Sequence, residues 1–231
     1  MEAVDADPDT QSSKVRISLA RHSAHVRDEA LRLAAGFELG DDERDLIVEA
    51  ALWHDLGKAH PAFVARMGGR QPPLAKSPDF NPKPAGEIAQ QRPYFRHELA
   101  SALGYLANHG WSEEASLAAY LIAAHHGKVR LRLCALPREP PADGGRLFAR
   151  GVWDGDLLPN TRLGEIEIPE TALDLDLMLL GDGRCGPSWS ARTQHLLHRL
   201  GPFQLAWLEA LVRIADWRAS QMEEEAGHDD L

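Results

Sequence analysis

The 231-residue chain is poor in cysteine, with only Cys134 and Cys185. They have no CxxC spacing and no secretory context, so we expect reduced thiols and neither a disulfide nor a cysteine-based metal site. No window approaches the uninterrupted apolar length of a membrane span, and the first residues do not resemble a targeting signal. We therefore expect a cytoplasmic protein with no membrane partner.

A Gly-rich phosphate loop ending in Lys-Ser or Lys-Thr is also missing, as are internal repeats and helicase-type sequence. These absences exclude an ATP-driven motor within this chain.

The net charge of −10 is concentrated at the two ends. Residues 1–13 carry four acidic and no basic side chains, and residues 222–231 carry five acidic ones, Glu223, Glu224, Glu225, Asp229 and Asp230. Without these nine, 26 acidic face 25 basic residues. We expect both tails to be frayed and solvated, around a single domain over 14–221. Such a body can still hold phosphates if it binds metal, because a bound cation dominates the local field.

Helical periodicity dominates the remaining sequence and predicts a mainly α fold. The periodic runs cover about 15–37, 41–56, 61–67, 95–108, 112–126, 188–200 and 203–225. Asp41, Ser112 and Ser188 are expected at helix starts, the first two as N-caps, and Gly201-Pro202 should interrupt the last run.

Two segments break the helical pattern. Residues 68–93 contain six prolines, which predicts an extended, mobile loop. Residues 127–187 form an irregular insertion. Within it, the alternation of Ile166 and Ile168 with Leu173, Leu175 and Leu177 predicts a short β-hairpin.

Histidines and one aspartate lie where apolar helices end. His54-Asp55 and His125-His126 each follow an apolar run and precede a glycine. A carboxylate beside an imidazole can bridge two metal ions while the imidazole binds one of them. Two adjacent histidines cannot both point into an apolar core, and a negative helix end tolerates a cation.

Asp216 lies on the edge of the apolar face of the last helix. A buried, unpaired carboxylate is costly, so a cation should face it. The alternative partners, Arg213 and Arg218, point to other faces of the helix. Imidazoles with carboxylates and no thiolates suit Mn, Fe, Co, Ni or Zn, with Mg also open, and two such ions are a common device for phosphoester cleavage.

The ordered motifs resemble the HD superfamily of metal-dependent phosphohydrolases. More narrowly, they resemble the HD nuclease attached to, or encoded beside, the CRISPR-associated helicase of type I systems. The resemblance rests on LARHSAHV around His22, HDLGK from His54, RHE around His97, HHG from His125 and ADWRAS around Asp216.

This resemblance implies an HD-superfamily helical bundle holding two divalent metal ions. One ion would be held by His22, His54, Asp55 and Asp216, and the second by Asp55, His97, His125 and His126. Asp55 would bridge the ions, Lys58 would touch the scissile phosphate or assist the leaving group, and Ser220 would support the site or the substrate. His25 is a rival to His22 because both lie in one helical turn, and His60 and His109 have no place in the pattern and are expected at the surface.

The implied activity is degradation of single-stranded DNA, with a helicase and an RNA-guided surveillance complex as partners. Lys128, Arg130 and Arg132 open a basic loop that follows the ligands and could track a DNA backbone, or could equally be a solvated loop. Two alternatives stay open: an HD phosphohydrolase acting on nucleotides or cyclic dinucleotides, and a non-enzymatic module that recruits partners through the insertion.

Overall fold

The computed structural model describes residues 13–84 and 86–227. Seven helices in this part of the chain are α1 (Leu19–Gly36), α2 (Asp41–Trp53), α3 (Pro61–Arg66), α4 (Glu87–Gln91), α5 (His97–His109), α6 (Glu113–Ala124) and α7 (Trp189–Ala226). Three short 3₁₀ turns are η2 (Leu56–Ala59), η3 (Asp143–Gly145) and η4 (Asp176–Met178). The mainly α prediction is confirmed.

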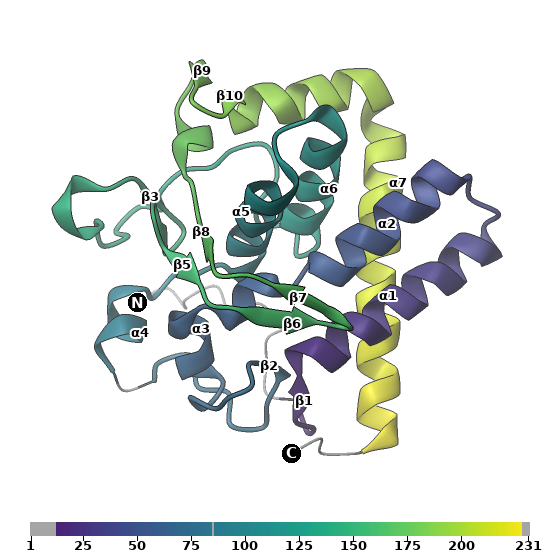
Figure 1. Cartoon of the computed structure of the whole chain (residues 1–231), viewed down its shortest axis with the longest axis horizontal. Helices are drawn as coiled ribbons and strands as arrows, with labels where there is room; N and C mark the ends of the chain where they lie inside the picture. The colour runs from purple at the N-terminus through teal and green to yellow at the C-terminus, as the bar shows by residue number, and fades with distance from the viewer. Residues whose placement is uncertain (1–12, 85, 228–231) are drawn as a thin grey trace.

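The strands are short and pair two by two. Antiparallel pairs form between β1 (Ile17–Ser18) and β2 (Leu74–Lys76), β3 (Phe148–Ala149) and β4 (Val152–Trp153), β5 (Leu157–Leu158) and β8 (Thr171–Ala172), β6 (Thr161–Leu163) and β7 (Ile166–Ile168), and β9 (Asp182–Gly183) and β10 (Gly186–Pro187). All but the first pair lie in the insertion, which runs across one side of the helices (Figure 1).

The helical core is formed by α1, α2, α5, α6 and the second half of α7. Residues 115–124 of α6 are all buried, and so are the first ten residues of α5, which agrees with helices enclosed on all sides over most of their length. Figure 1 shows α7 crossing the top of the molecule and then turning to run beside α1 and α2. The turn is at Gly201, whose φ of 76° is non-helical, and Pro202 follows it, as predicted.

Helix starts and ends agree with the predictions in part. The Ser112 side chain accepts a hydrogen bond from the Ala115 amide at 3.1 Å and caps α6. The prediction for Asp41 is wrong, because Gly40 is the N-cap and Asp41 is the first helical residue. Its carboxylate still suits the positive end of the helix.

The insertion contains the predicted hairpin, but with a different partner strand. Ile166–Ile168 pairs with Thr161–Leu163, whereas Leu173, Leu175 and Leu177 are buried in the core. Apolar burial, rather than strand pairing, therefore explains the leucine alternation. The proline-rich segment is likewise more structured than a loop, since it contains β2 and α4.

The expectation of a frayed C-terminal tail is wrong for its first residues. Helix α7 continues to Ala226, and Glu223 is buried with 3% of its surface exposed. Residues 228–231 and 1–12, which carry the rest of the expected tails, lie outside the described residues. Among the described helices, none has the length and apolar content needed to cross a membrane.

Candidate metal centre

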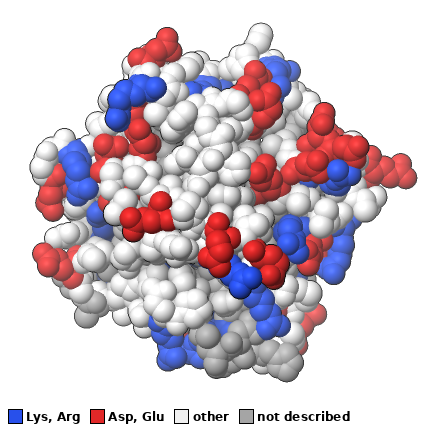
Figure 2. Space-filling model, in the orientation of Figure 1, with Lys and Arg blue, Asp and Glu red and all other residues white. Residues whose placement is uncertain are grey.

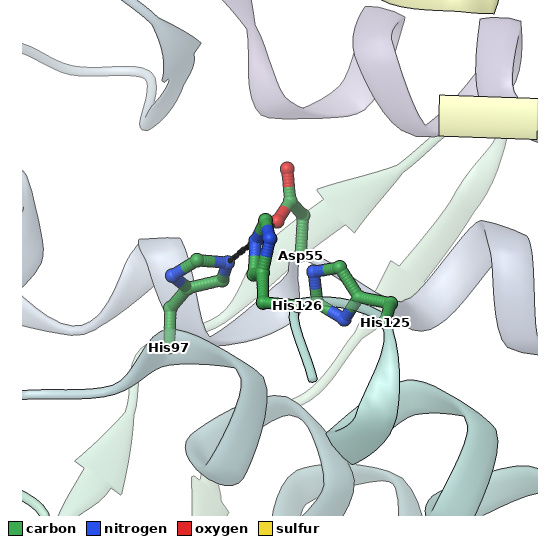
Figure 3. A group of neighbouring side chains, drawn as sticks. All are labelled: Asp55, His97, His125 and His126. Carbon is green, nitrogen blue, oxygen red and sulfur yellow. Dashed lines mark hydrogen bonds and ion pairs between the residues drawn. The ribbon is translucent and has the colours of Figure 1, made fainter. Parts of the chain in front are cut away.

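The seven predicted ligands meet at one place in the fold. Their donor atoms form two groups, Asp55–His97–His125–His126 and His22–His54–Asp216, and the atoms within each group lie within 4.8 Å of one another. Figure 3 shows the first group, with its imidazoles and the carboxylate turned toward a common point. All seven residues are buried, although five separate helices or helix ends supply them.

A close backbone approach places Asp55 beside helix α5. Gly57 follows in η2, and its amide donates a hydrogen bond to the Ser101 hydroxyl at 2.8 Å. A Cβ at Gly57 would collide with the carbonyl of His97 and lie 2.9 Å from the Ala100 Cβ. Glycine therefore permits the contact that brings Asp55 to His97.

Backbone carbonyls fix two of the imidazoles. The Nδ1 of His54 lies 2.7 Å from the Ala51 carbonyl, and the Nδ1 of His125 lies 2.6 Å from the Ile122 carbonyl. Each Nδ1–H donates to its carbonyl, which leaves Nε2 with a free lone pair. Within the described chain both Nε2 atoms are buried and make no hydrogen bond. Buried acceptors of this kind are costly unless a cation uses them, so the residues fit a metal ion.

Asp55 faces both groups with different oxygens. Its Oδ1 lies 3.1 Å from His97 Nε2, while Oδ2 lies 3.3 Å from His54 Nε2 and 3.5 Å from His22 Nε2. Lys58 Nζ is 2.7 Å from the same Oδ2 and donates to the Ala75 carbonyl at 3.1 Å. This is the arrangement required of a carboxylate that bridges two ions.

The electrostatics hold the two carboxylates and His125 in the protonation states that metals need. Burial would raise the pKa of Asp55, but His54 and Lys58 lower it well below its usual value. Asp216 behaves in the same way: burial would raise its pKa, but its hydrogen bond with His22 and the nearby His54 imidazole lower it well below its usual value. Burial lowers the pKa of His125 to about 3, with smaller contributions from neighbouring histidines. The centre therefore presents anionic carboxylates with a neutral His125.

His22, and not His25, belongs to the second group. His22 Nε2 lies 3.2 Å from Asp216 Oδ1, and the other side of the ring lies 3.0 Å from Glu223. Burial opposes protonation of His22, but Glu223 and Asp216 raise its pKa to about 9. His25 contacts Glu223 from a position 24% exposed, outside both groups. Glu223 was missed in the sequence, although it follows Asp216 by seven residues and so lies on the same helix face.

The remaining predicted residues lie around the centre with varied contacts. Ser220 donates a hydrogen bond to Asp216 Oδ1 at 3.3 Å, which fits a supporting role. Lys128 is half-buried and Arg132 is exposed. Arg130 is 52% exposed, but its guanidinium lies 2.8 Å from Glu209.

The surface expectation for His60 is wrong. His60 is 5% exposed, its Nδ1 accepts from the Ala62 amide at 3.1 Å, and its ring stacks on Phe95. It caps α3, which is a structural task that a ligand pattern cannot reveal. The surface expectation for His109 is confirmed: it is exposed, stacks on Tyr105 and lies 3.1 Å from Glu49.

The prediction that neither Arg213 nor Arg218 faces Asp216 is confirmed. Arg218 turns away to Glu29 at 2.9 Å, and Arg213 lies over the Trp217 ring. The histidines of the centre, rather than an arginine, face the Asp216 carboxylate.

Comparison with known proteins adds one match. A family model described as "Cas3, HD domain" matches residues 15–224, a span that includes all seven donor residues. No curated protein and no solved structure matches the chain. The matched span covers nearly all of the chain, so the protein belongs to the Cas3 HD domain family of CRISPR-associated HD nucleases.

Proposed function

We propose that this protein is a divalent-metal-dependent phosphodiesterase that degrades single-stranded DNA in a type I CRISPR interference system. It would act with a separate or fused helicase and with an RNA-guided surveillance complex. The observation that supports this proposal most is the sharing of Asp55 between two buried donor groups.

The donor set indicates which ions the centre would hold. One site would use His22, His54, Asp55 and Asp216, and the other Asp55, His97, His125 and His126. Five imidazoles among the seven donors favour Mn, Fe, Co, Ni or Zn over Mg, which prefers an all-oxygen shell. When bound, such a pair of ions supplies an activated water and neutralises charge on the phosphate.

The protein's own residues would position the substrate around these ions. Lys58 is buried and its ammonium already lies at the bridging carboxylate, which places a positive charge where the scissile phosphate would be held. Lys128, Arg130 and Arg132 follow the HHG motif directly and would contact the DNA backbone, with Ser220 supporting Asp216.

Local charge at the centre is more important for this binding than the overall field. Figure 2 shows acidic and basic side chains interspersed over one face, so the field over that face is mixed. Metal ions at the donor groups would dominate it locally.

The test combines metal analysis with degradation assays. Chelator-treated protein receives each divalent metal in turn, and bound metal is measured by mass spectrometry alongside cleavage of circular and linear single-stranded DNA. We expect metal-dependent cleavage that Asp55→Ala and His54→Ala abolish, while the exposed-histidine control His198→Ala keeps full activity. Full activity in excess chelator would contradict the proposal. Hydrolysis of nucleotides or cyclic dinucleotides without cleavage of DNA would favour the small-molecule alternative.

A further inference from the structure

Glu223 is a buried carboxylate on α7 that belongs to neither donor group. Both of its oxygens lie close to His22 Nδ1, at 3.0 and 3.1 Å, and Oε1 lies 2.8 Å from His25 Nδ1. Lys76 Nζ of β2 lies 3.4 Å from Oε2. Groups from α1 and β2 therefore fix the carboxylate in place and offset the cost of burying it.

The two ring nitrogens of His22 face different partners. Nδ1 points to Glu223, whereas Nε2 points to the centre, 3.2 Å from Asp216 and 3.5 Å from Asp55. A carboxylate that accepts Nδ1–H selects the tautomer whose Nε2 lone pair is available to a metal. It also makes that lone pair more basic.

The acceptor behind His22 differs from those behind other imidazoles of the centre. His54 and His125 donate to carbonyls three residues earlier in their own segments, so local helical geometry orients them. His97 Nδ1 lies 3.7 Å from the Glu98 carboxylate, beyond good hydrogen-bonding distance. The orientation of His22 instead depends on a charged side chain 201 residues away in the sequence.

We propose that Glu223 is a positioning residue of the metal site formed by His22, His54 and Asp216. Its carboxylate holds the His22 ring with Nε2 toward the ion and strengthens binding at that site. This inference rests on the proposed two-metal centre. If Glu223 only tied α1 to α7, its loss would lower stability without acting selectively on one metal site.

The first test is anaerobic Mn²⁺ titration of the full chain, with free Mn²⁺ followed by its electron paramagnetic resonance signal. We expect wild type to bind two ions. Glu223→Ala should weaken one site by roughly 10- to 100-fold and leave the other unchanged, as removal of an outer-shell partner typically does. Glu223→Gln, which keeps a hydrogen-bond acceptor, should show a smaller loss. Glu225→Gln makes the same change at an exposed position of the same helix and should match wild type.

The second test uses the metal-free protein, so it does not depend on the proposed function. Nuclear magnetic resonance of ¹⁵N-labelled histidine should show a strongly downfield Nδ1–H for His22, identified by its loss in His22→Asn. This signal should disappear in Glu223→Ala. Urea unfolding of each variant verifies that it is folded.

The outcomes distinguish failure of the role proposed for Glu223 from failure of the two-metal function. Unchanged Mn²⁺ binding in both Glu223 variants, while wild type binds two ions, overturns the role of Glu223. Equal weakening of both sites with reduced stability also overturns it and indicates a structural tie. If wild type binds no Mn²⁺, the two-metal function fails, and the His22 signal then decides by itself whether Glu223 orients the ring.

Discussion

Gly57 lies against the backbone carbonyl of His97 so closely that a methyl group would not fit between them. This contact joins the turn that follows α2 to the first residue of α5. It places Asp55, two residues earlier, with Oδ1 3.1 Å from the His97 imidazole. The glycine of the HDLGK motif thus acts on the metal centre through packing rather than through chemistry.

Gly57→Ala should therefore damage both stability and metal binding. The added methyl must push η2 away from α5, and overpacking of this kind costs typically about 1–3 kcal/mol. Urea unfolding should show that loss, and Mn²⁺ titration should show weaker binding because Asp55 moves relative to His97.

Gly36→Ala is the matched control for this change. Gly36 lies in the last turn of α1, and a Cβ there would have no atom within 4 Å. Because alanine favours a helix over glycine by roughly 1 kcal/mol, this variant should be neutral or slightly more stable. Equal destabilisation in both variants would contradict the packing role of Gly57.

Five of the seven donor residues have a local signal in the sequence, whereas His22 and His97 were implied only by the resemblance to a family. His54-Asp55 and His125-His126 are adjacent pairs at the ends of apolar helices, and the charge at Asp216 interrupts an apolar stripe. The resemblance to a family then supplied their grouping. The geometry agrees with that grouping, since Asp55 lies with one group and also contacts the other.

Features that depend on long-range contacts could not be predicted in the same way. Glu223 was assigned to a solvated tail because its neighbours Glu224 and Glu225 are acidic, yet helix α7 turns it toward His22 and Lys76. The burial of His60 depends on its stacking against Phe95. Nothing in the local pattern of either residue records these partners.

Lys58 offers a test that separates catalysis from metal binding. Its ammonium lies 2.7 Å from Asp55 Oδ2 and so competes with a cation for that oxygen. Lys58→Met should keep two bound Mn²⁺ ions, with equal or tighter affinity, while the rate of DNA cleavage falls roughly 100-fold through loss of charge stabilisation at the phosphate. Lys83→Met, at an exposed position, should leave both measurements unchanged.

A Lys58 variant that loses metal and activity together would instead assign the lysine to the assembly of the centre. In that case Lys58 would orient Asp55 and would have no separate role at the substrate.

Arg130 and Arg132 should respond differently to substitution although they are two residues apart. Arg132 is exposed, so Arg132→Ala should raise KM for single-stranded DNA several-fold and reduce the salt dependence of binding by about one phosphate contact. Arg130 is held by Glu209 at 2.8 Å, and its removal should cost at most about 1 kcal/mol of stability with a smaller change in KM. Fluorescence anisotropy at several salt concentrations measures the DNA affinity and its salt dependence for both variants. Identical salt slopes for Arg132→Ala and wild type would exclude a phosphate contact by Arg132.

The stability of the metal-free protein should fall as pH drops below about 6.5. Burial lowers the pKa of His60 from 6.5 to about 4, which the Asp156 carboxylate opposes and Arg92 assists. Between these values His60 binds a proton in the unfolded chain but not in the folded one. The free energy of unfolding therefore falls by up to about 1.4 kcal/mol for each pH unit. His60→Asn, which keeps a good helix cap, should reduce the slope between pH 6.5 and 4 in urea unfolding with chelator present, and His125, whose pKa is lowered to about 3, accounts for part of the slope that remains. The exposed control His198→Asn should leave the slope as in wild type.

At alkaline pH the stability should instead fall as pH rises, because of His22. Its pKa is raised from 6.5 to about 9, because Glu223 and Asp216 outweigh the effect of burial. Folded His22 keeps a proton that the unfolded chain has lost, so its contribution is complete below pH 6.5 and disappears as pH rises through about 9. Glu223→Gln removes the largest favourable charge and should flatten this alkaline decline, whereas Glu225→Gln should not. An unchanged decline in Glu223→Gln would show that another group loses its proton there.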